Sequence, residues 1–448
     1  MLLSIILFAA IIFIAPEEDA NFWNSVALGG LMVFFWIFEL LPIYVTALFP
    51  MFLAVPLGVL EPEQMAGQYG HRMVYLFFGG FVLSLALEKW EVHKQIAEGI
   101  IQIVGTSTSR ILLGFLLATG LLSMWISNTA TALMMLPMAM AVIRGLPVKK
   151  GSKFPLYLLL AIAYGASLGG MATLVGTPPN GAMLSILESN YGVSIDFFDW
   201  MKIGLPLSLI MMLVVYGFFL LFLGKERKDR IEGFEIKKKP WTKEQLRVMA
   251  LFLVIVVLWS FRGPITKYTG IMYRDEGPAI LGAILLFIIP STKKASLLVW
   301  KDMRNLPWGI LILFGGGLAL AKLLEVNGVI SELSHVFDQF DGVHTLILLL
   351  VLVSIAIYGT EVMSNLALVN VFVPVVAVFA LQTDYSLLQL CIPVTLAASC
   401  AFMLPISTPP NAIVFSSGAI KINQMVRVGF VLNLVAVIIV SVFSLFFI

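Results

Sequence analysis

The chain has 448 residues, of which 60% are hydrophobic and only 12% are charged. Because a soluble domain carries about 25% charged residues, this composition excludes an ordinary soluble protein and indicates an all-α polytopic membrane protein. The formal net charge is only +2, and the basic residues lie in short segments between apolar stretches, so nucleic-acid binding has no support. The lipid bilayer is the expected surrounding of most of the chain.

The N-terminal segment 1–15 is apolar and ends before Pro16, with the acidic run Glu17–Asp19 behind it. A secretory signal peptide begins with a basic region, and this stretch has none. Residues 1–22 are therefore predicted to hold a first transmembrane helix.

A membrane crossing needs about 20 apolar residues. On this measure about eleven segments are predicted to cross or nearly cross the membrane, two of them as broken helices at 155–188 and 386–418. The others lie near 1–15, 24–41, 43–60, 73–88, 201–223, 247–261, 277–290, 307–324 and 426–447. The apolar segments 110–143 and 343–380 are too long for one crossing and carry Ser-Asn at their middle, so we expect re-entrant hairpins there.

Charge in the connections predicts the orientation. Alternate connections are basic, at 144–153, 225–243, 293–304 and 421–427, and the connections between them are acidic, at 17–19, 61–63, 188–199 and 332–341. The alternation holds if each hairpin enters and leaves on one side of the membrane. It places the N-terminus in the cytoplasm and the C-terminus outside, in a multi-pass protein of the inner (plasma) membrane.

Two short sequence motifs each occur twice in the chain. Ser127-Asn128-Thr129 precedes Gly176-Thr177-Pro178-Pro179-Asn180, and Ser364-Asn365-Leu366 precedes Ser407-Thr408-Pro409-Pro410-Asn411. Subtracting positions gives an offset of 237 for the Ser-Asn pairs and 231 for the Thr-Pro-Pro-Asn motifs. The segments 76–80 and 312–316, which both end in Gly-Gly, match at an offset of 236. We therefore predict inverted repeats at 23–224 and 247–448, joined by a cytoplasmic linker at 225–246.

The residue types in these motifs suit an ion-coupled site. Two consecutive prolines break a helix and leave carbonyls without partners, and such carbonyls near Gly176 and Ser407 can ligate Na⁺. Thr177 and Thr408 add hydroxyls to the same place. Because no basic residue lies near either motif, a bound dianion would need cotransported cations to offset its desolvation.

Each of these elements on its own has a simpler explanation. A lone Ser-Asn in a membrane helix is usually a helix–helix hydrogen bond and a lone Pro-Pro is usually a kink, but four such elements in two matched pairs favour a site. Cys391 and Cys400 lie nine residues apart, which on one helix is about 13 Å and too far for a disulfide. No acid pair or histidine cluster supports a membrane-embedded enzyme, and an ion channel would show uncoupled currents.

The paired Ser-Asn and Thr-Pro-Pro-Asn motifs resemble those of the divalent anion–sodium symporter family, which includes the Na⁺-coupled dicarboxylate transporters. The resemblance covers nearly the whole chain. It implies a homodimer whose protomers have scaffold and transport domains and move as an elevator. It also implies Na⁺-coupled uptake of C4-dicarboxylates such as succinate, fumarate or malate. A Na⁺-independent exchanger and a sulfate or tricarboxylate carrier of the same family remain alternatives.

The same resemblance implies the site residues. One Na⁺ site would use Ser123, Ser127, Asn128 and Gly176, and the other would use Thr360, Met363, Asn365 and Ser407. The substrate would meet Ser127, Asn128, Thr129, Thr177, Ser364, Asn365, Thr408 and Pro409. Leu366 departs from the family pattern, because dicarboxylate carriers often have a smaller residue there, and we expect it to narrow the pocket.

Overall fold

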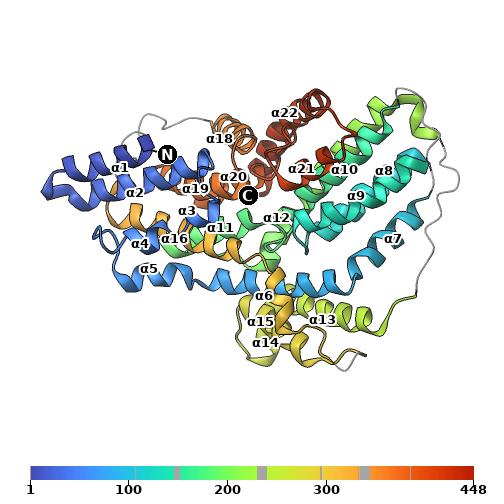
Figure 1. The fold of residues 1–448 in the computed structure, drawn as a ribbon, viewed down its shortest axis with the longest axis horizontal. Coiled ribbons are helices and arrows are strands. Elements are labelled where there is room, and N and C mark those ends of the chain that lie inside the picture. The colour runs from blue at the N-terminus through green and yellow to red at the C-terminus, as the bar shows by residue number, and fades with distance from the viewer. Residues whose placement is uncertain are drawn as a thin grey trace.

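The computed structural model describes residues 2–105, 107–145, 152–229, 240–292, 295–330, 332, 344–383 and 385–448. Within these ranges the regular structure is helical, with an isolated β-bridge between Pro290 and Ser296. The all-α fold predicted from composition is confirmed. Figure 1 shows an elongated bundle, with α1 (Leu2–Ile14) and α2 (Ala20–Ile37) packed together at one end.

The prediction of one continuous span at 43–60 is wrong. The structure has two short helices there, α3 (Ile43–Thr46) and α4 (Phe49–Leu53), followed by turns. Proline favours the first turn of a helix, and Pro50 begins α4 in this way, while Gly58 takes a φ of +70° that interrupts regular helix. An average of hydropathy along the sequence does not reveal where such short helices end.

The rest of the first half runs through α5 (Pro62–Tyr69), α6 (Arg72–Lys89), α7 (Val92–Val104), α8 (Thr108–Ser123), α9 (Asn128–Gly145), α10 (Phe154–Gly170), α11 (Pro178–Tyr191) and α12 (Phe197–Leu223). The second half runs through α13 (Lys243–Ser260), α14 (Arg262–Thr269), α15 (Glu276–Ile288), α16 (Trp308–Val326), α18 (Thr345–Thr360), α19 (Asn365–Gln382), α20 (Leu387–Ala397), α21 (Pro409–Ser416) and α22 (Ile422–Phe447). Short 3₁₀ turns lie at Glu17–Asp19, Gly224–Lys228 and Trp300–Asn305.

Among the described residues, six helices are long and apolar enough to cross a membrane, or seven if α13 and α14, bent by 77°, form one span. The predicted count of about eleven crossings is therefore not reached by continuous helices. Several predicted spans are divided by breaks, which leaves pieces such as α10, with 17 residues, and α20, with 11 residues. Residues 230–239 of the predicted linker and 333–341 of the acidic connection predicted at 332–341 lie outside the described ranges.

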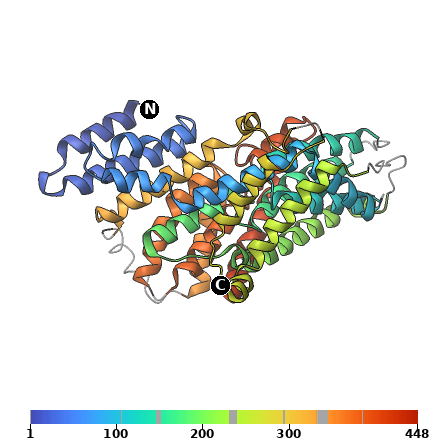
Figure 2. The same ribbon diagram turned by 90° about the horizontal axis from the view of Figure 1, so that it is seen from below.

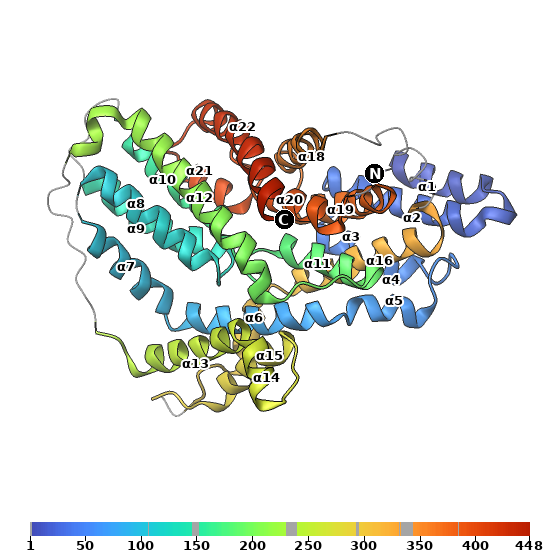
Figure 3. The ribbon, with the colours of Figure 1, turned by 180° about the vertical axis from the view of Figure 1, so that it is seen from behind.

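The helices that carry the repeated motifs pack in a reciprocal pattern. In the first half α10 lies against α8, α9 and α12, and in the second half α20 lies against α18, α19 and α22. The halves also contact each other crosswise, because α9 and α10 pack on α21 while α19 and α20 pack on α11. Figure 3 shows α12 beside α10 and α22 beside α20. The view from below in Figure 2 shows the N-terminal helices (blue) and α7–α9 (teal) at opposite ends.

Candidate functional site

Two helix pairs meet at short non-helical tips. The first tip, residues 124–127, joins α8 to α9, and the second tip, residues 361–364, joins α18 to α19. At the first tip Ser127 Oγ accepts a hydrogen bond of 3.2 Å from the N–H of Ala130. At the second tip Ser364 Oγ accepts one of 3.2 Å from the N–H of Ala367. Each serine thus caps the helix that follows it, which explains its place in the repeated motif.

The asparagine that follows each capping serine accepts a hydrogen bond from a hydroxyl group at the end of the preceding helix. Ser123 Oγ donates to Asn128 Oδ1 at 2.5 Å, and Thr360 Oγ1 donates to Asn365 Oδ1 at 2.7 Å. Ser123 and Thr360 are fully buried, whereas the two asparagines are half-buried. Beside each tip a hydroxyl oxygen and an amide oxygen therefore lie next to each other, and hard cations bind oxygen ligands of these types.

The first break, residues 171–177, separates α10 from α11. Thr177 precedes α11, and Pro178 occupies its first turn, where the missing N–H costs nothing. The side chain of Asn180 then reaches back across the break, and its Nδ2 donates to the carbonyls of Gly170 at 3.3 Å and Thr173 at 2.8 Å. The asparagine of the motif therefore satisfies carbonyls that the break in the helix leaves without helical partners.

The second break, residues 398–408, separates α20 from α21 and repeats this arrangement. Asn411 Nδ2 donates to the carbonyls of Ala401 at 3.0 Å and Leu404 at 3.1 Å. The spacings of ten and seven residues are those of Asn180. Thr408 Oγ1 additionally accepts from the N–H of Asn411 at 3.4 Å.

Close approach to the first tip explains two glycines. A Cβ on Gly170 would lie 2.5 Å from Asn128 Oδ1, and a Cβ on Gly176 would lie 2.5 Å from the carbonyl oxygen of Gly170. Thr173 Oγ1 also donates to the carbonyl of Met124 in the first tip at 2.5 Å. The first tip and the first break are therefore in direct contact, and side chains at these two glycines would separate them.

The tips and the breaks of both halves line one cavity of about 190 Å³. The lining residues from the motifs are Ser127, Asn128, Thr129, Gly176, Thr177, Pro178, Pro179, Ser364, Asn365, Leu366, Ser407, Thr408, Pro409 and Pro410. Of the residues predicted for the site, the structure brings all together at this cavity except Ser123, Thr360 and Met363. Ser123 and Thr360 lie behind the asparagines, and Met363 is half-buried beside Ser364.

Five further residues complete the wall and were missed from the sequence: Ile43, Tyr44, Phe81, Ile310 and Leu313. They carry no motif of their own. The available signal was the matched pair of Gly-Gly runs, because Phe81 follows Gly80 directly and Leu313 lies two residues before Gly315. Of the residues that the structure describes, no lysine, arginine, histidine, aspartate or glutamate lines the cavity.

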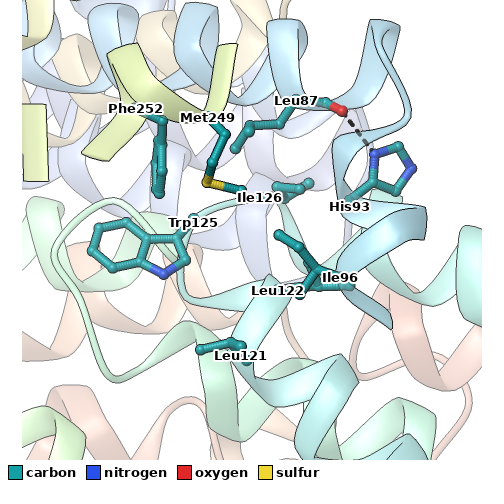
Figure 4. Close-up of a pocket in the computed structure, with 9 residues that line it drawn as sticks. All are labelled: Leu87, His93, Ile96, Leu121, Leu122, Trp125, Ile126, Met249 and Phe252. Atoms are coloured by element: carbon teal, nitrogen blue, oxygen red, sulfur yellow. Dashed lines mark hydrogen bonds between the residues drawn. The ribbon is translucent and has the colours of Figure 1, made fainter. Parts of the chain in front are cut away.

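Figure 4 shows a second cavity, of about 170 Å³, beside Leu121, Leu122, Trp125 and Ile126 at the end of α8 and the first tip. Its walls are apolar, and its one ionisable group, His93, has Nδ1 2.9 Å from the carbonyl oxygen of Leu87. This cavity offers nothing that would hold an anion. Within the described ranges, no group of three or more His, Cys, Asp or Glu residues is placed to hold a metal ion.

Broken helices that turn hydroxyls, amides and helix ends onto one cavity inside an apolar bundle define a membrane transporter of the secondary type. The family model for the sodium:sulfate symporter transmembrane region matches residues 1–448, and the chain belongs to this family. The resemblance predicted from the motifs is confirmed. The chain is accordingly a membrane-spanning transporter and not an enzyme.

Two relatives agree with this family. The sodium-dependent dicarboxylate transporter SdcS of Staphylococcus saprophyticus is 38% identical over 426 residues, which cover 90% of this chain and 82% of the relative. The protein of the same name from Staphylococcus aureus (strain USA300) is 37% identical over the same length.

One solved structure shares the fold. It is titled as the crystal structure of the Alcanivorax borkumensis YdaH transporter, and it matches with a TM-score of 0.61 over 93% of this chain and 98% of that chain. The sequence identity is 11%, so the likeness is one of fold alone.

Proposed function

We propose that the chain carries small dicarboxylates such as succinate, fumarate or malate into the cell together with Na⁺. The observation that carries the proposal is the uncharged cavity onto which both tips and both breaks open. The relatives at 38% and 37% identity are named sodium-dependent dicarboxylate transporters, and the family is named for sodium symport.

Four helix N-termini supply the attraction for an anion. The first residues of α9, α11, α19 and α21 are Asn128, Pro178, Asn365 and Pro409, and all four line the cavity. A helix N-terminus carries a partial positive charge of about half an elementary unit, so it favours a carboxylate. The first turns of α9 and α19 can also donate N–H groups, whereas α11 and α21 each begin with two prolines, which have no N–H. Two N-termini come from each half, which fits a ligand with a carboxylate at each end.

Helix ends alone do not neutralise a dianion in a membrane, because an unpaired charge costs many kcal/mol to desolvate. Na⁺ ions beside the carboxylates reduce this cost. In the proposal, Ser123, Ser127, Asn128 and the carbonyl of Gly176 hold one Na⁺. Thr360, the carbonyl of Met363, Asn365 and Ser407 hold the other. The paired oxygens of Ser123 with Asn128 and of Thr360 with Asn365 support these assignments.

The carboxylates of the substrate would accept hydrogen bonds at the remaining motif positions. Thr129, Thr177 and Thr408 line the cavity and offer hydroxyl donors, and Ser127, Asn128, Ser364 and Asn365 are shared with the cation sites. Leu366 lies in the wall and is 6% exposed, and its bulk favours a short, unbranched dianion over citrate.

The proposal includes the larger architecture. The repeated tip and break hydrogen bonds support inverted repeats at 23–224 and 247–448, with the first helix (1–22) outside them and the linker 225–246 between. The chain would sit in the plasma membrane with the N-terminus in the cytoplasm and the C-terminus outside. The chain would form a homodimer whose transport domains move as elevators. Its re-entrant hairpins would lie at 110–143 and 343–380, and its broken helices at 155–188 and 386–418.

The test is uptake of radiolabelled succinate into proteoliposomes. Uptake driven by an inward Na⁺ gradient, lost when choline replaces Na⁺ and reduced by unlabelled fumarate or malate, is the expected result. Equal uptake driven by internal dicarboxylate without Na⁺ would make the chain an exchanger. Competition by sulfate or citrate that exceeds that of fumarate would reassign the cargo.

A further inference from the structure

Glu361 occupies an unusual place in the second tip. Its side chain is 3% exposed, and it directly follows Thr360, one of the proposed cation ligands. Glu361 Oε1 accepts hydrogen bonds from the backbone N–H groups of Phe402 at 2.7 Å and Met403 at 2.8 Å, and Oε2 accepts one from Leu404 at 2.9 Å. One carboxylate thus binds three consecutive amides of the second break.

A fourth donor reaches the same carboxylate from another helix. Asn433 Nδ2, in α22, donates to Glu361 Oε1 at 2.8 Å. An ionised carboxylate only accepts hydrogen bonds, and all four neighbours are donors, so the geometry fits the charged form. Among the described residues, no lysine, arginine or histidine forms an ion pair with Glu361. The second half therefore holds a buried negative charge that lacks a basic partner in this part of the chain.

The first tip, residues 124–127, has no charged residue. Met124 stands at the matching position, directly after Ser123, the counterpart of Thr360. There the tip meets the break through the carbonyl of Met124, which accepts a hydrogen bond from the neutral hydroxyl of Thr173. The two halves share the asparagine contacts, but the contact between tip and break is made by a carboxylate in the second half and by neutral groups in the first half.

We propose that Glu361 is a positioning residue that anchors the second break with a fixed negative charge, and that this charge makes the cation site of the second half the tighter of the two. The proposal rests on the proposed function, since it assumes two Na⁺ sites. The carboxylate orients the second break through the N–H groups of residues 402–404. The carbonyl oxygen of Leu404 in turn accepts a hydrogen bond of 2.6 Å from Oγ of Ser407, a proposed ligand of the cation. Glu361 directly follows Thr360 in the sequence and is the only charged residue within the two tips, 124–127 and 361–364. In a medium of low dielectric a fixed negative charge attracts a cation strongly even when the two are not in contact.

The experiment measures Na⁺ binding without substrate. Purified protein is titrated with NaCl at constant ionic strength, with choline chloride as the replacement, and the thermal unfolding midpoint is followed. For E361Q the Na⁺ concentration that gives half of the shift should rise about tenfold, because the charge is lost. For E361D, which keeps the charge, it should stay within about threefold of the wild-type value.

A double variant separates charge from local geometry. In E361Q/N433D the carboxylate is moved to α22, where the side chain at 433 already faces position 361. We expect it to restore the half-shift concentration to within about threefold of wild type, and to restore membrane insertion if E361Q alone fails to insert. As a matched control, D275N removes another buried carboxylate, which binds the N–H of Phe197 at 2.8 Å, pairs with Arg262 and does not line the cavity. It should leave the half-shift concentration unchanged.

Three results would overturn the inference: an unchanged half-shift concentration in E361Q, an equal rise in E361D and E361Q, or no restoration by N433D. Failure of the proposed function would look different. A wild-type protein that Na⁺ stabilises, but that takes up no succinate under a Na⁺ gradient, would refute the cargo and leave the role of Glu361 to be decided by the titration.

Discussion

Thr360 Oγ1 donates a hydrogen bond of 2.7 Å to Asn365 Oδ1, and the same bond joins Ser123 to Asn128 in the other half of the chain. Both bonds span five residues and both join a fully buried hydroxyl to a half-buried amide at the cavity. A pairing that recurs in two separate places, each beside a helix break, indicates one local design used twice. Each copy places an asparagine side chain at the cavity, Asn128 from the first half and Asn365 from the second.

The first prediction concerns these asparagines. Asn128→Ala and Asn365→Ala each remove an amide oxygen from a proposed cation site, and each should reduce Na⁺-driven succinate uptake by at least about tenfold, the effect of losing one strong ligand contact. Uptake into proteoliposomes is measured after matching the amounts of inserted protein. Asn305→Ala, at an exposed asparagine of the Trp300–Asn305 turn, is the control and should behave as wild type. Normal uptake by both cavity variants would refute the site assignment.

A second prediction tests the contact between the first tip and α10. Gly170→Ala places a methyl group where Asn128 Oδ1 now lies, at 2.5 Å, so Asn128 must move. Transport should fall about tenfold or more, although no proposed ligand is altered, because the displaced amide no longer faces the cation. Gly217→Ala is the matched control within α12, since no atom lies within 4 Å of the added Cβ. That change should leave uptake intact and stabilise the helix by about 0.5–1 kcal/mol. Equal uptake by the two alanine variants would contradict the prediction.

The sequence was informative about the site for a physical reason. Proline pairs and Ser-Asn in apolar segments are costly in a bilayer, so Pro178, Pro179 and Asn128 stand out against their surroundings and mark the breaks and the tips. The matched spacings then place the motifs in corresponding halves. The cavity that contains both sets of motifs follows from this reasoning.

Other features depend on contacts that spacing does not reveal. Glu361 lies three residues before the second Ser-Asn motif, but its partners Phe402 and Asn433 lie 41 and 72 residues away in the sequence. The wall residues Ile43 and Tyr44 belong to a segment whose hydropathy resembles a simple span. Its division into α3 and α4 reflects turns near Pro50 and Gly58, and averaged hydropathy does not respond to them.

A third prediction separates stability from transport chemistry at the breaks. Asn180 and Asn411 are fully buried, and their Nδ2 groups satisfy carbonyls within the first and second breaks. Asn180→Ala and Asn411→Ala should each lower the free energy of unfolding by about 1–3 kcal/mol, the cost of leaving buried polar groups without partners. Thermal unfolding in detergent measures the change, and Asn305→Ala again provides the exposed control. Unfolding midpoints equal to wild type would show that the breaks do not need these bonds.

The fourth prediction is a pH dependence carried by His93. This residue lies in α7, which is neither a candidate span nor among the apolar helices, and it is 8% exposed beside the carbonyl of Leu87. Burial lowers the pKa of His93 below its ordinary value of about 6.5, the neighbouring Lys94 lowers it further, and the contacts with Leu87 and Glu91 oppose the shift. Below about pH 6.5 His93 therefore becomes protonated in the unfolded chain while it is still largely neutral in the folded protein.

The sign follows from this difference in proton binding. The contribution of His93 to stability is complete above about pH 6.5 and is lost as the pH falls through the lowered pKa of the folded state. His93→Asn removes the titrating group, so its unfolding midpoint should fall less steeply than that of wild type between about pH 6.5 and pH 5. Thermal unfolding in detergent across this range measures both slopes. The comparison is between slopes because the substitution also changes packing and shifts both midpoints at every pH. Parallel curves for the two proteins would mean that the imidazole takes up its proton equally in the folded and unfolded states.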